Sequence, residues 1–271
     1  MKAWAGVAEA YRRSFAQACA GAIEPLLAVT DATDARGAAR VHDRIGPLRH
    51  LDVGCGDGRL AAAASETGRA VVACDVDAPM CELTRSSAPG VVVVTASLPT
   101  LPWPSHAFDV VTANFVINHV DDPRACVREM ARVCRPGGVV AATIWPAGGG
   151  GFGAALRPAF SVQGVAPLPD QSLPAERDFE RSVGGMHGLF RDAGLTAVTA
   201  TELYWVWAIS PADLWAGITA GVATPGMTYL AQSRDVQARM KAVFFETAAV
   251  MCTNGSLTFD ARAVLATGRA S

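Results

Sequence analysis

The sequence predicts an α/β fold in which helices cover both faces of a mostly parallel sheet. Residues 49–145 alternate short apolar segments with amphipathic ones, the pattern of strands separated by helices. The apolar segments are hydrophobic along their whole length, as expected of parallel strands that are buried on both faces. A chain of 271 residues, with 51% hydrophobic and 18% charged residues, can bury a substantial core.

Composition excludes several classes of function. The net charge is −2 and no basic run occurs, so we expect no nucleic-acid partner. The first residues carry charges where a signal peptide has its apolar core, and no stretch of 18 apolar residues exists. We therefore expect a cytoplasmic protein without a membrane partner. Seven cysteines without a C-x-x-C pair and five histidines without metal-ligand spacing indicate buried thiols and no metal site.

The chain is expected to begin with a helical cap. Apolar residues from Trp4 to Ala22 recur at steps of three and four, which predicts a helix over 2–29. Pro25 either breaks this helix or stands in the first turn of a second one. The polar segment that follows predicts a linker, so we divide the chain into a cap and linker over 1–47 and a main domain over 48–271.

Two interpretations of the cap are open. It either covers the sheet, or it acts as a lid that contributes Tyr11, Arg12 or Phe15 to a pocket.

The centre of the main domain is the segment Leu51-Asp-Val-Gly-Cys-Gly-Asp-Gly58. It joins a predicted strand at 50–53 to a helix at 60–65 through glycines at alternate positions, which let the backbone approach a bound molecule. The next predicted strand, 70–75, ends in the acid Asp75. A glycine turn after one strand and an acid at the end of the next favour a nucleoside across the carboxyl ends of a parallel sheet.

The remaining elements follow in order along the chain. Further predicted elements of the first part are a helix at 79–86, strands at 91–96, 108–113 and 139–144, a loop at 98–104 and a helix at 122–133. The Gly/Pro-rich segment 146–170 predicts a mobile loop over the site. Beyond it we expect a helix at 179–193, a strand at 196–209, helices at 211–220 and 234–251 within a helical insertion at 211–252, and a strand at 258–267.

The glycine spacing narrows the type of nucleotide fold. The pattern Gly-x-Gly-x-Gly differs from the Gly-x-Gly-x-x-Gly of dinucleotide sites, and no Lys-Ser/Thr follows it as in a phosphate-binding P-loop. Residues 49–145 resemble the class I S-adenosylmethionine-dependent methyltransferases. The motifs that match in order are Leu51-Asp-Val-Gly-Cys-Gly-Asp-Gly58, Ala73-Cys-Asp-Val-Asp-Ala-Pro-Met80, Leu101-Pro-Trp-Pro104, Phe108-Asp-Val-Val-Thr-Ala-Asn-Phe-Val-Ile-Asn-His-Val120 and Arg132-Val-Cys-Arg-Pro-Gly-Gly138.

The resemblance implies a Rossmann-like sheet of seven strands with the last strand antiparallel, and S-adenosyl-L-methionine as cofactor. It also assigns roles to residues. Gly54 and Gly56 would pack against the methionine part of the cofactor, Asp52 would face its ammonium group, and Asp75 would bind the ribose hydroxyls. The other implied cofactor residues are Tyr11, Val76, Met80, Ser97, Leu98, Asn114 and Phe115. Ser97 stands where the family usually has an acid that binds the adenine amino group.

The implied reaction is methyl transfer to the O, N or C atom of a small molecule, of the kind that bacterial natural-product enzymes carry out. Such a displacement needs alignment of the reacting atoms above all, and a base where the acceptor carries a proton. His119 is the candidate base; otherwise it is a structural histidine at a helix start, and His187 and Tyr204 are weaker candidates.

The acceptor pocket is expected to be lined by the loop 146–170 and by Trp145, Tyr204, Trp205, Trp207 and Trp215, which would favour a flat, hydrophobic acceptor. The aromatic residues of the strand at 196–209 could instead fill the core. The alternative function is a protein of this fold that binds the cofactor without methyl transfer, such as a cyclase or an accessory subunit. We expect a monomer or homodimer.

Overall fold

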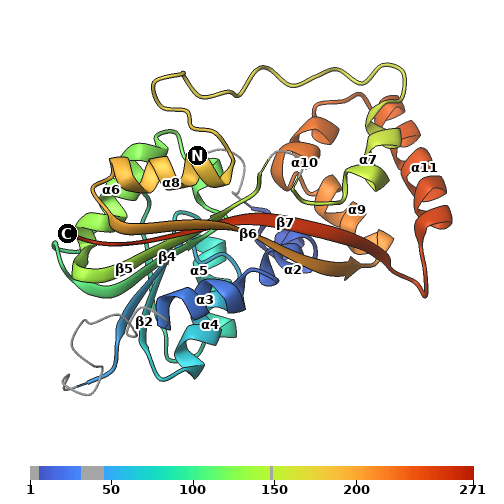
Figure 1. The fold of residues 1–271 in the computed structure, drawn as a ribbon. Coiled ribbons are helices and arrows are strands. Elements are labelled where there is room, and N and C mark those ends of the chain that lie inside the picture. The colour runs from blue at the N-terminus through green and yellow to red at the C-terminus, as the bar shows by residue number, and fades with distance from the viewer. Residues whose placement is uncertain (1–5, 32–45, 147–148) are drawn as a thin grey trace.

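The fold is a single sheet of seven strands between two layers of helices (Figure 1). The computed structural model describes residues 6–31, 46–146 and 149–271. The strand order is β3-β2-β1-β4-β5-β7-β6. The strands are β1 (Arg49–Val53), β2 (Ala70–Asp75), β3 (Val92–Thr95), β4 (Phe108–Asn114), β5 (Cys134–Ile144), β6 (Thr196–Ile209) and β7 (Leu257–Arg269). Strands β1 to β5 pair in parallel, whereas β7 is antiparallel to both β5 and β6, which confirms the predicted fold class.

The first of two core regions is the sheet itself, with apolar residues buried on each of its faces. Helices α6 (Pro123–Val133) and α8 (Val183–Asp192) cover one face, and α3 (Ile23–Asp31), α4 (Arg59–Glu66) and α5 (Ala78–Ser87) cover the other (Figure 1). On the first face Met130 and Phe190 are completely buried against the sheet, and on the second Leu26 and Ala61 are. Burying both faces in this way explains why the central strands are apolar along their whole length.

The N-terminal cap is three short helices rather than one. Helices α1 (Ala8–Arg13), α2 (Phe15–Ala20) and α3 are separated at Ser14 and at Gly21. Ser14 leaves the helical region at ψ −98° while its hydroxyl donates to the carbonyl of Ala10 at 2.6 Å. A serine hydroxyl that bonds the backbone in this way competes with the helix, a feature that hydrophobic periodicity does not detect. Pro25 stands in the first turn of α3.

Two parts of the predicted cap fall outside the described ranges. These are residues 2–5, which include Trp4, and most of the predicted linker. The boundary between the cap and the main domain stays a prediction.

A second core lies beside the antiparallel strands β6 and β7, at the end where β6 finishes and β7 begins (Figure 1). There the helices α7 (Gly153–Phe160), α9 (Pro211–Thr219), α10 (Ala223–Leu230) and α11 (Arg234–Met251) pack around buried Trp207, Trp215 and Phe244. The predicted loop 146–170 thus contains a helix, and the segment 211–252 has three helices where we expected two. The sequence of α10, Ala-Thr-Pro-Gly, is typical of a turn, but its proline stands in the first helical turn, where no backbone donor is lost.

Two negative findings apply to the described residues. None of their helices combines the length and apolarity needed to cross a bilayer. They also contain no cluster of His, Cys, Asp and Glu that could hold a metal ion.

Candidate active site

A cavity of about 430 Å³ lies at the carboxyl ends of β1, β2 and β4. Eleven of the twelve residues predicted for the site line it: Tyr11, Gly54, Gly56, Asp75, Val76, Met80, Ser97, Leu98, Asn114, Phe115 and His119. The twelfth, Asp52, lines a smaller adjoining cavity. The residues from Gly54 to His119 surround one space because parallel strands bring their carboxyl ends to the same edge of the sheet, and Tyr11 joins them from helix α1.

The glycine turn forms the floor of the cavity. The backbone N–H groups of Gly54 and Cys55 both donate to the carbonyl of Cys74, at 2.7 and 2.9 Å, which fixes the turn to the end of β2. Gly54 and Gly56 have φ values of +69° and +55°. A Cβ on Gly54 would also approach Val116 to 2.3 Å, so both the conformation and the space require glycine.

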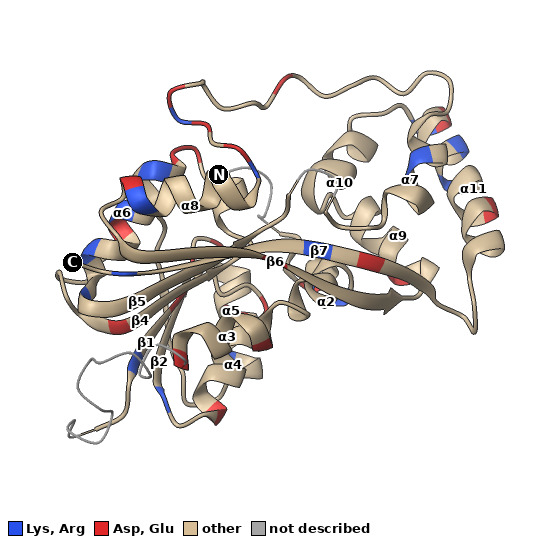
Figure 2. Ribbon diagram, viewed as in Figure 1, with Lys and Arg blue, Asp and Glu red and all other residues tan. Residues whose placement is uncertain are grey.

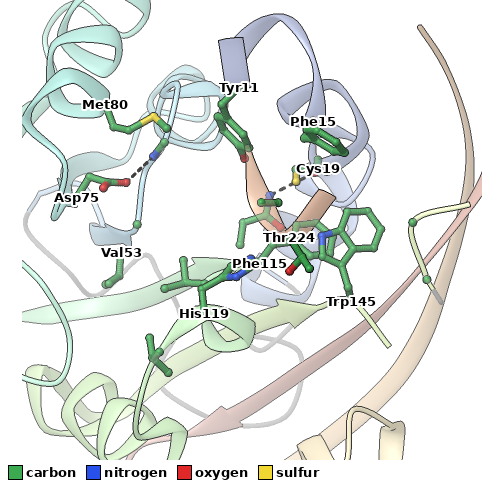
Figure 3. A pocket seen from close by; sticks show the side chains of 18 of the residues that line it. Tyr11, Phe15, Cys19, Val53, Asp75, Met80, Phe115, His119, Trp145 and Thr224 are labelled. Carbon is green, nitrogen blue, oxygen red and sulfur yellow. Dashed lines mark hydrogen bonds between the residues drawn. The ribbon is translucent and has the colours of Figure 1, made fainter. Parts of the chain in front are cut away.

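Asp75 is oriented by the backbone around it. One carboxylate oxygen accepts from the N–H of Gly56 at 3.0 Å (Figure 3), and the other accepts from the N–H of Asp77 at 3.0 Å. Burial nevertheless raises the pKa of Asp75 above its ordinary value. The carboxylate is held at the cavity wall with lone pairs left for a ligand's hydroxyl groups.

Asp52 is buried beside the glycine turn, and neither of its carboxylate oxygens has a hydrogen-bond partner among the described residues. Burial, with the charges of Asp75 and Asp57, raises its pKa to about 8. A buried carboxyl group without partners carries a large desolvation cost, which a cationic group would relieve. This orphaned acid and the Cβ-free turn fit the ammonium and methionine parts that the resemblance places there.

The end of β4 holds a strained aromatic residue. Phe115 has φ +58°, a left-handed conformation that is costly for a residue with a side chain. Its N–H donates to the carbonyl and the hydroxyl of Thr143, at 3.1 and 3.0 Å, and its ring stacks on Trp145 at 4.1 Å between centroids. The same threonine donates to the side chain of Asn114 at 2.5 Å, so β5 fixes both the last residue of β4 and the residue that follows it.

Asn118 fixes the end of β5 in turn. Its side-chain nitrogen donates to the carbonyl of Trp145 at 3.0 Å, and its side-chain oxygen accepts from the N–H of Trp145 at 2.9 Å. Asn118 belongs to the same short helix, η3 (Ile117–His119), as His119. One amide therefore connects the turn that carries His119 with the backbone of Trp145.

His119 lines the cavity, and burial lowers its pKa to about 4. It is therefore neutral near pH 7, the form in which one ring nitrogen can accept a proton. The weaker candidates lie elsewhere. His187 is exposed on α8, and Tyr204 is 69% exposed on β6, where its hydroxyl donates to Glu202.

The predicted aromatic lining was correct for Trp145 and wrong for four residues. Trp207 and Trp215 belong to the second core, Trp205 contacts Trp145 with 5.7 Å between ring centroids but does not line the cavity, and Tyr204 faces solvent. Alternation along β6 identified the two faces of the strand but not what covers each face. For Trp207 the alternative of core filling is the correct one.

Several lining residues were not predicted. Cys19, Thr224 and Pro225 line the cavity without having been predicted to do so. Phe15, one of the three residues proposed for a lid, lines it as well, and so does Phe152, which lies in the loop 146–170 that was expected to line the acceptor pocket. Figure 3 shows Tyr11, Phe15 and Cys19 on one side of the cavity, contributed by α1 and α2. Phe15 also contacts Phe152 edge to face, with 5.3 Å between ring centroids. These residues come from elements distant in sequence, and no motif marks them.

The part of the predicted loop that follows β5 is anchored to β7. The carbonyl of Gly149 accepts from the N–H of Arg262 at 2.8 Å. Gly151 adopts φ +74°, and a Cβ there would lie 2.3 Å from the carbonyl oxygen of Asp260. Glycines in this segment therefore serve close packing on a strand, which explains why a glycine-rich composition predicted a loop.

Comparison with known proteins agrees with the resemblance to methyltransferases found in the sequence. The sequence model of the methyltransferase domain family matches residues 51–142. Malonyl-[acyl-carrier protein] O-methyltransferase of Salmonella typhimurium is 36% identical over 93 residues, covering 34% of this chain and 37% of the relative. Demethylmenaquinone methyltransferase of Renibacterium salmoninarum is 32% identical over 101 residues, covering 36% of this chain and 43% of the relative.

These matches span less than half of either relative. The crystal structure of the YcgJ protein of Bacillus subtilis superposes with a TM-score of 0.54 at 18% identity, covering 91% of this chain and 97% of that one, which supports the fold. Residues 51–142 thus match the methyltransferase domain family, in agreement with the resemblance to the class I S-adenosylmethionine-dependent methyltransferases that the sequence motifs carry.

Proposed function

We propose that this protein binds S-adenosyl-L-methionine in the cavity beside the glycine turn and transfers its methyl group to a small-molecule acceptor. The observation that carries the proposal is the buried, unpartnered carboxyl group of Asp52 next to a turn that admits no Cβ, with the oriented carboxylate of Asp75 across it. These three features suit an ammonium, a methionine chain and a ribose.

Each cofactor-binding residue has a distinct task in this proposal. Asp52 holds the ammonium and Asp75 the ribose hydroxyls. Val76, Met80, Ser97 and Leu98 surround the adenine, while Asn114 and Phe115 border the methionine part. Tyr11 covers Gly56, since a Cβ there would lie 3.4 Å from its ring. The cofactor supplies a methyl group on a positively charged sulfur, which already favours departure of the leaving group.

The protein's remaining tasks are alignment and proton removal. Holding the acceptor in line with the methyl group accounts for a large part of the acceleration in such a displacement. Where the acceptor atom carries a proton, the neutral imidazole of His119 is the group that accepts it. His119 would take the proton from the acceptor atom as that atom receives the methyl group, which the bound cofactor would supply with its sulfur as the leaving group.

The test is calorimetric titration of the protein with S-adenosylhomocysteine and S-adenosylmethionine, repeated with Asp75→Ala. We expect micromolar binding that weakens at least tenfold in the variant, because the ribose loses its charged hydrogen-bond acceptor. The matched control is Asp170→Ala, an exposed carboxylate that does not line the cavity. Equal affinity of wild type and Asp75→Ala contradicts the assignment of the ribose site. Cofactor binding without transfer to any acceptor favours the alternative of a non-transferring protein.

A further inference from the structure

We infer that the acceptor is an uncharged, flat, apolar molecule with a single polar reacting group, bound between aromatic side chains in the half of the cavity away from Asp75. This inference rests on the proposed function, in which the cofactor occupies the other half. Figure 3 shows the division: Asp75 and Met80 lie at one end of the cavity, and Trp145 and Thr224 lie at the other.

Aromatic rings from separate elements border the acceptor half. Phe115 follows β4 and stacks on Trp145 after β5, with an interplanar angle of 18°. Phe15 of α2 meets Phe152, just before α7, at an angle of 76°. All four rings line the cavity. Two pairs of rings that line one cavity offer a planar apolar group both stacking and edge contacts.

The charge of the lining distinguishes neutral from charged acceptors. Among the described lining residues, Asp75 is the only one with a side chain of Asp, Glu, Lys or Arg. Burial raises the pKa of the Cys19 thiol to about 12, raises that of Tyr11 above its ordinary value and lowers that of His119 to about 4. All three are therefore neutral near pH 7. The first turn of helix α10 borders the acceptor half. The helix contains no Asp, Glu, Lys or Arg, and it is drawn entirely in tan in Figure 2.

A charged acceptor would lose its hydration in this half without gaining a counter-ion. A carboxylate or phosphate would find no cationic side chain among the described lining residues, and an unpaired buried charge is strongly disfavoured. An ammonium would find only Asp75, whose carboxylate lies at the opposite end and already accepts two backbone N–H groups.

Polar contacts in the acceptor half are few. Cys19 on α2 and Thr224 on α10 lie at this end of the cavity (Figure 3), and His119 beside β4 lines the same cavity. They can bind a single hydroxyl or amide group, which orients the acceptor while the rings hold its apolar part. Thr224 is thus the residue at which a new charge would change specificity.

The test compares three matched probes on protein saturated with S-adenosylhomocysteine: 2-naphthol, 6-hydroxy-2-naphthoate and the cation of 6-(aminomethyl)-2-naphthol. We expect calorimetry to give a Kd for 2-naphthol at least tenfold lower than for either charged probe. Thr224→Lys is expected to improve binding of the naphthoate at least tenfold. The control Thr219→Lys, an exposed position on α9 outside the cavity, is expected to leave the order of the probes unchanged.

The outcomes separate the two proposals. Tighter binding of either charged probe by the wild type, or no binding of 2-naphthol to protein that binds S-adenosylhomocysteine, overturns the inference alone. Absence of S-adenosylhomocysteine binding overturns the proposed function and this inference with it. The comparison of probes on the wild type does not depend on the folding of Thr224→Lys.

Discussion

Asp52 is the residue whose environment differs most from that of an ordinary surface carboxylate. It lies fully buried, without a hydrogen-bond partner among the described residues, and its pKa is raised to about 8. The group is therefore mainly protonated in the free protein at pH 7. A bound ammonium favours the ionised form, so the pKa falls when the ligand arrives.

This shift predicts proton release. Binding of S-adenosylhomocysteine at pH 7 is expected to release close to one proton, because Asp52 is mostly protonated before binding and ionised after it. Calorimetry in phosphate and in Tris, whose ionisation enthalpies differ, measures the number of protons. Asp52→Asn is the control and is expected to release none. Identical binding enthalpies of the wild type in the two buffers would contradict the assignment.

His119 gives a second prediction at this scale. Its pKa of about 4 keeps the imidazole neutral, so the proton-accepting form persists as the pH falls to about 5. His119→Ala is expected to lower kcat roughly 10²–10⁴-fold, the usual contribution of a general base. The affinity for S-adenosylhomocysteine is expected to stay within threefold, which separates a chemical role from a structural one. An unchanged kcat in steady-state kinetics would mean that alignment alone suffices.

Single residues were predictable from the sequence where a motif specifies the backbone. The alternate glycines and Asp75 form such a motif, and the residues that it implied gather around one cavity. Thr224 was not predictable, because it reaches the cavity through α10, whose position depends on the second core. Tyr204 and Trp215 were assigned to the site on aromatic character alone, which does not distinguish a pocket from a core.

At the scale of elements, two helical glycines have opposite surroundings. Gly21 ends α2 with helical dihedral angles, and a Cβ on it would lie 2.2 Å from the indole of Trp205. That indole is held by a hydrogen bond of 3.0 Å to the carbonyl of Ala18. Gly188 lies inside α8, and a Cβ on it would have no neighbour within 4 Å.

Replacing glycine with alanine should therefore change the free energy of unfolding in opposite directions at the two positions. Gly188→Ala is expected to raise the free energy of unfolding by about 0.5–1 kcal/mol through helix propensity. Gly21→Ala is expected to lower it by about 1–3 kcal/mol, because the methyl group displaces a fixed indole. Urea denaturation of both variants beside the wild type measures the two changes. Stabilisation by Gly21→Ala would show that α2 moves away from β6 without cost.

The secondary structure of the central sheet was predictable because its signals are local. Apolar runs bounded by turn residues predicted all seven strands, most of them to within a few residues. The breaks between α1, α2 and α3 were not predicted, since a side-chain hydrogen bond of Ser14 and the packing of Gly21 on β6 produce them. Helix α10 was missed because Pro-Gly favours a turn unless tertiary packing completes the helix.

At the scale of the whole molecule, a buried polar cluster ties the cap to the sheet. Arg69, before β2, donates to the hydroxyl of Thr30 at 2.8 Å and pairs with Asp31, both at the end of α3. It also lies 3.2 Å from Nδ1 of His50, whose Nε2 is 2.7 Å from the hydroxyl of Thr112. Burial and the charge of Arg69 lower the pKa of His50 to about 3.

This cluster predicts sensitivity to acid. The pKa of His50 in the folded protein lies below its ordinary value of 6.5, so the unfolded chain binds an extra proton between those values. Stability therefore falls as the pH decreases from about 6.5 toward 3. Between pH 7 and pH 5 the wild type is expected to lose about 2 kcal/mol more unfolding free energy than His50→Gln, as linkage requires for one such group. Equal losses in urea denaturation at the two pH values would contradict the buried neutral state.

The amide of Asn118 has a consequence for anyone who redesigns this protein. The side chain of Asn118 holds the backbone of Trp145 and belongs to the same short helix as His119. The proposed wall of the acceptor site and the proposed proton acceptor are therefore expected to move together. Changes at Trp145 that shift its backbone would displace the histidine as well. Thr224 and Phe152 belong to other elements, so a library that varies these two positions can alter acceptor choice while the machinery for chemistry keeps its geometry.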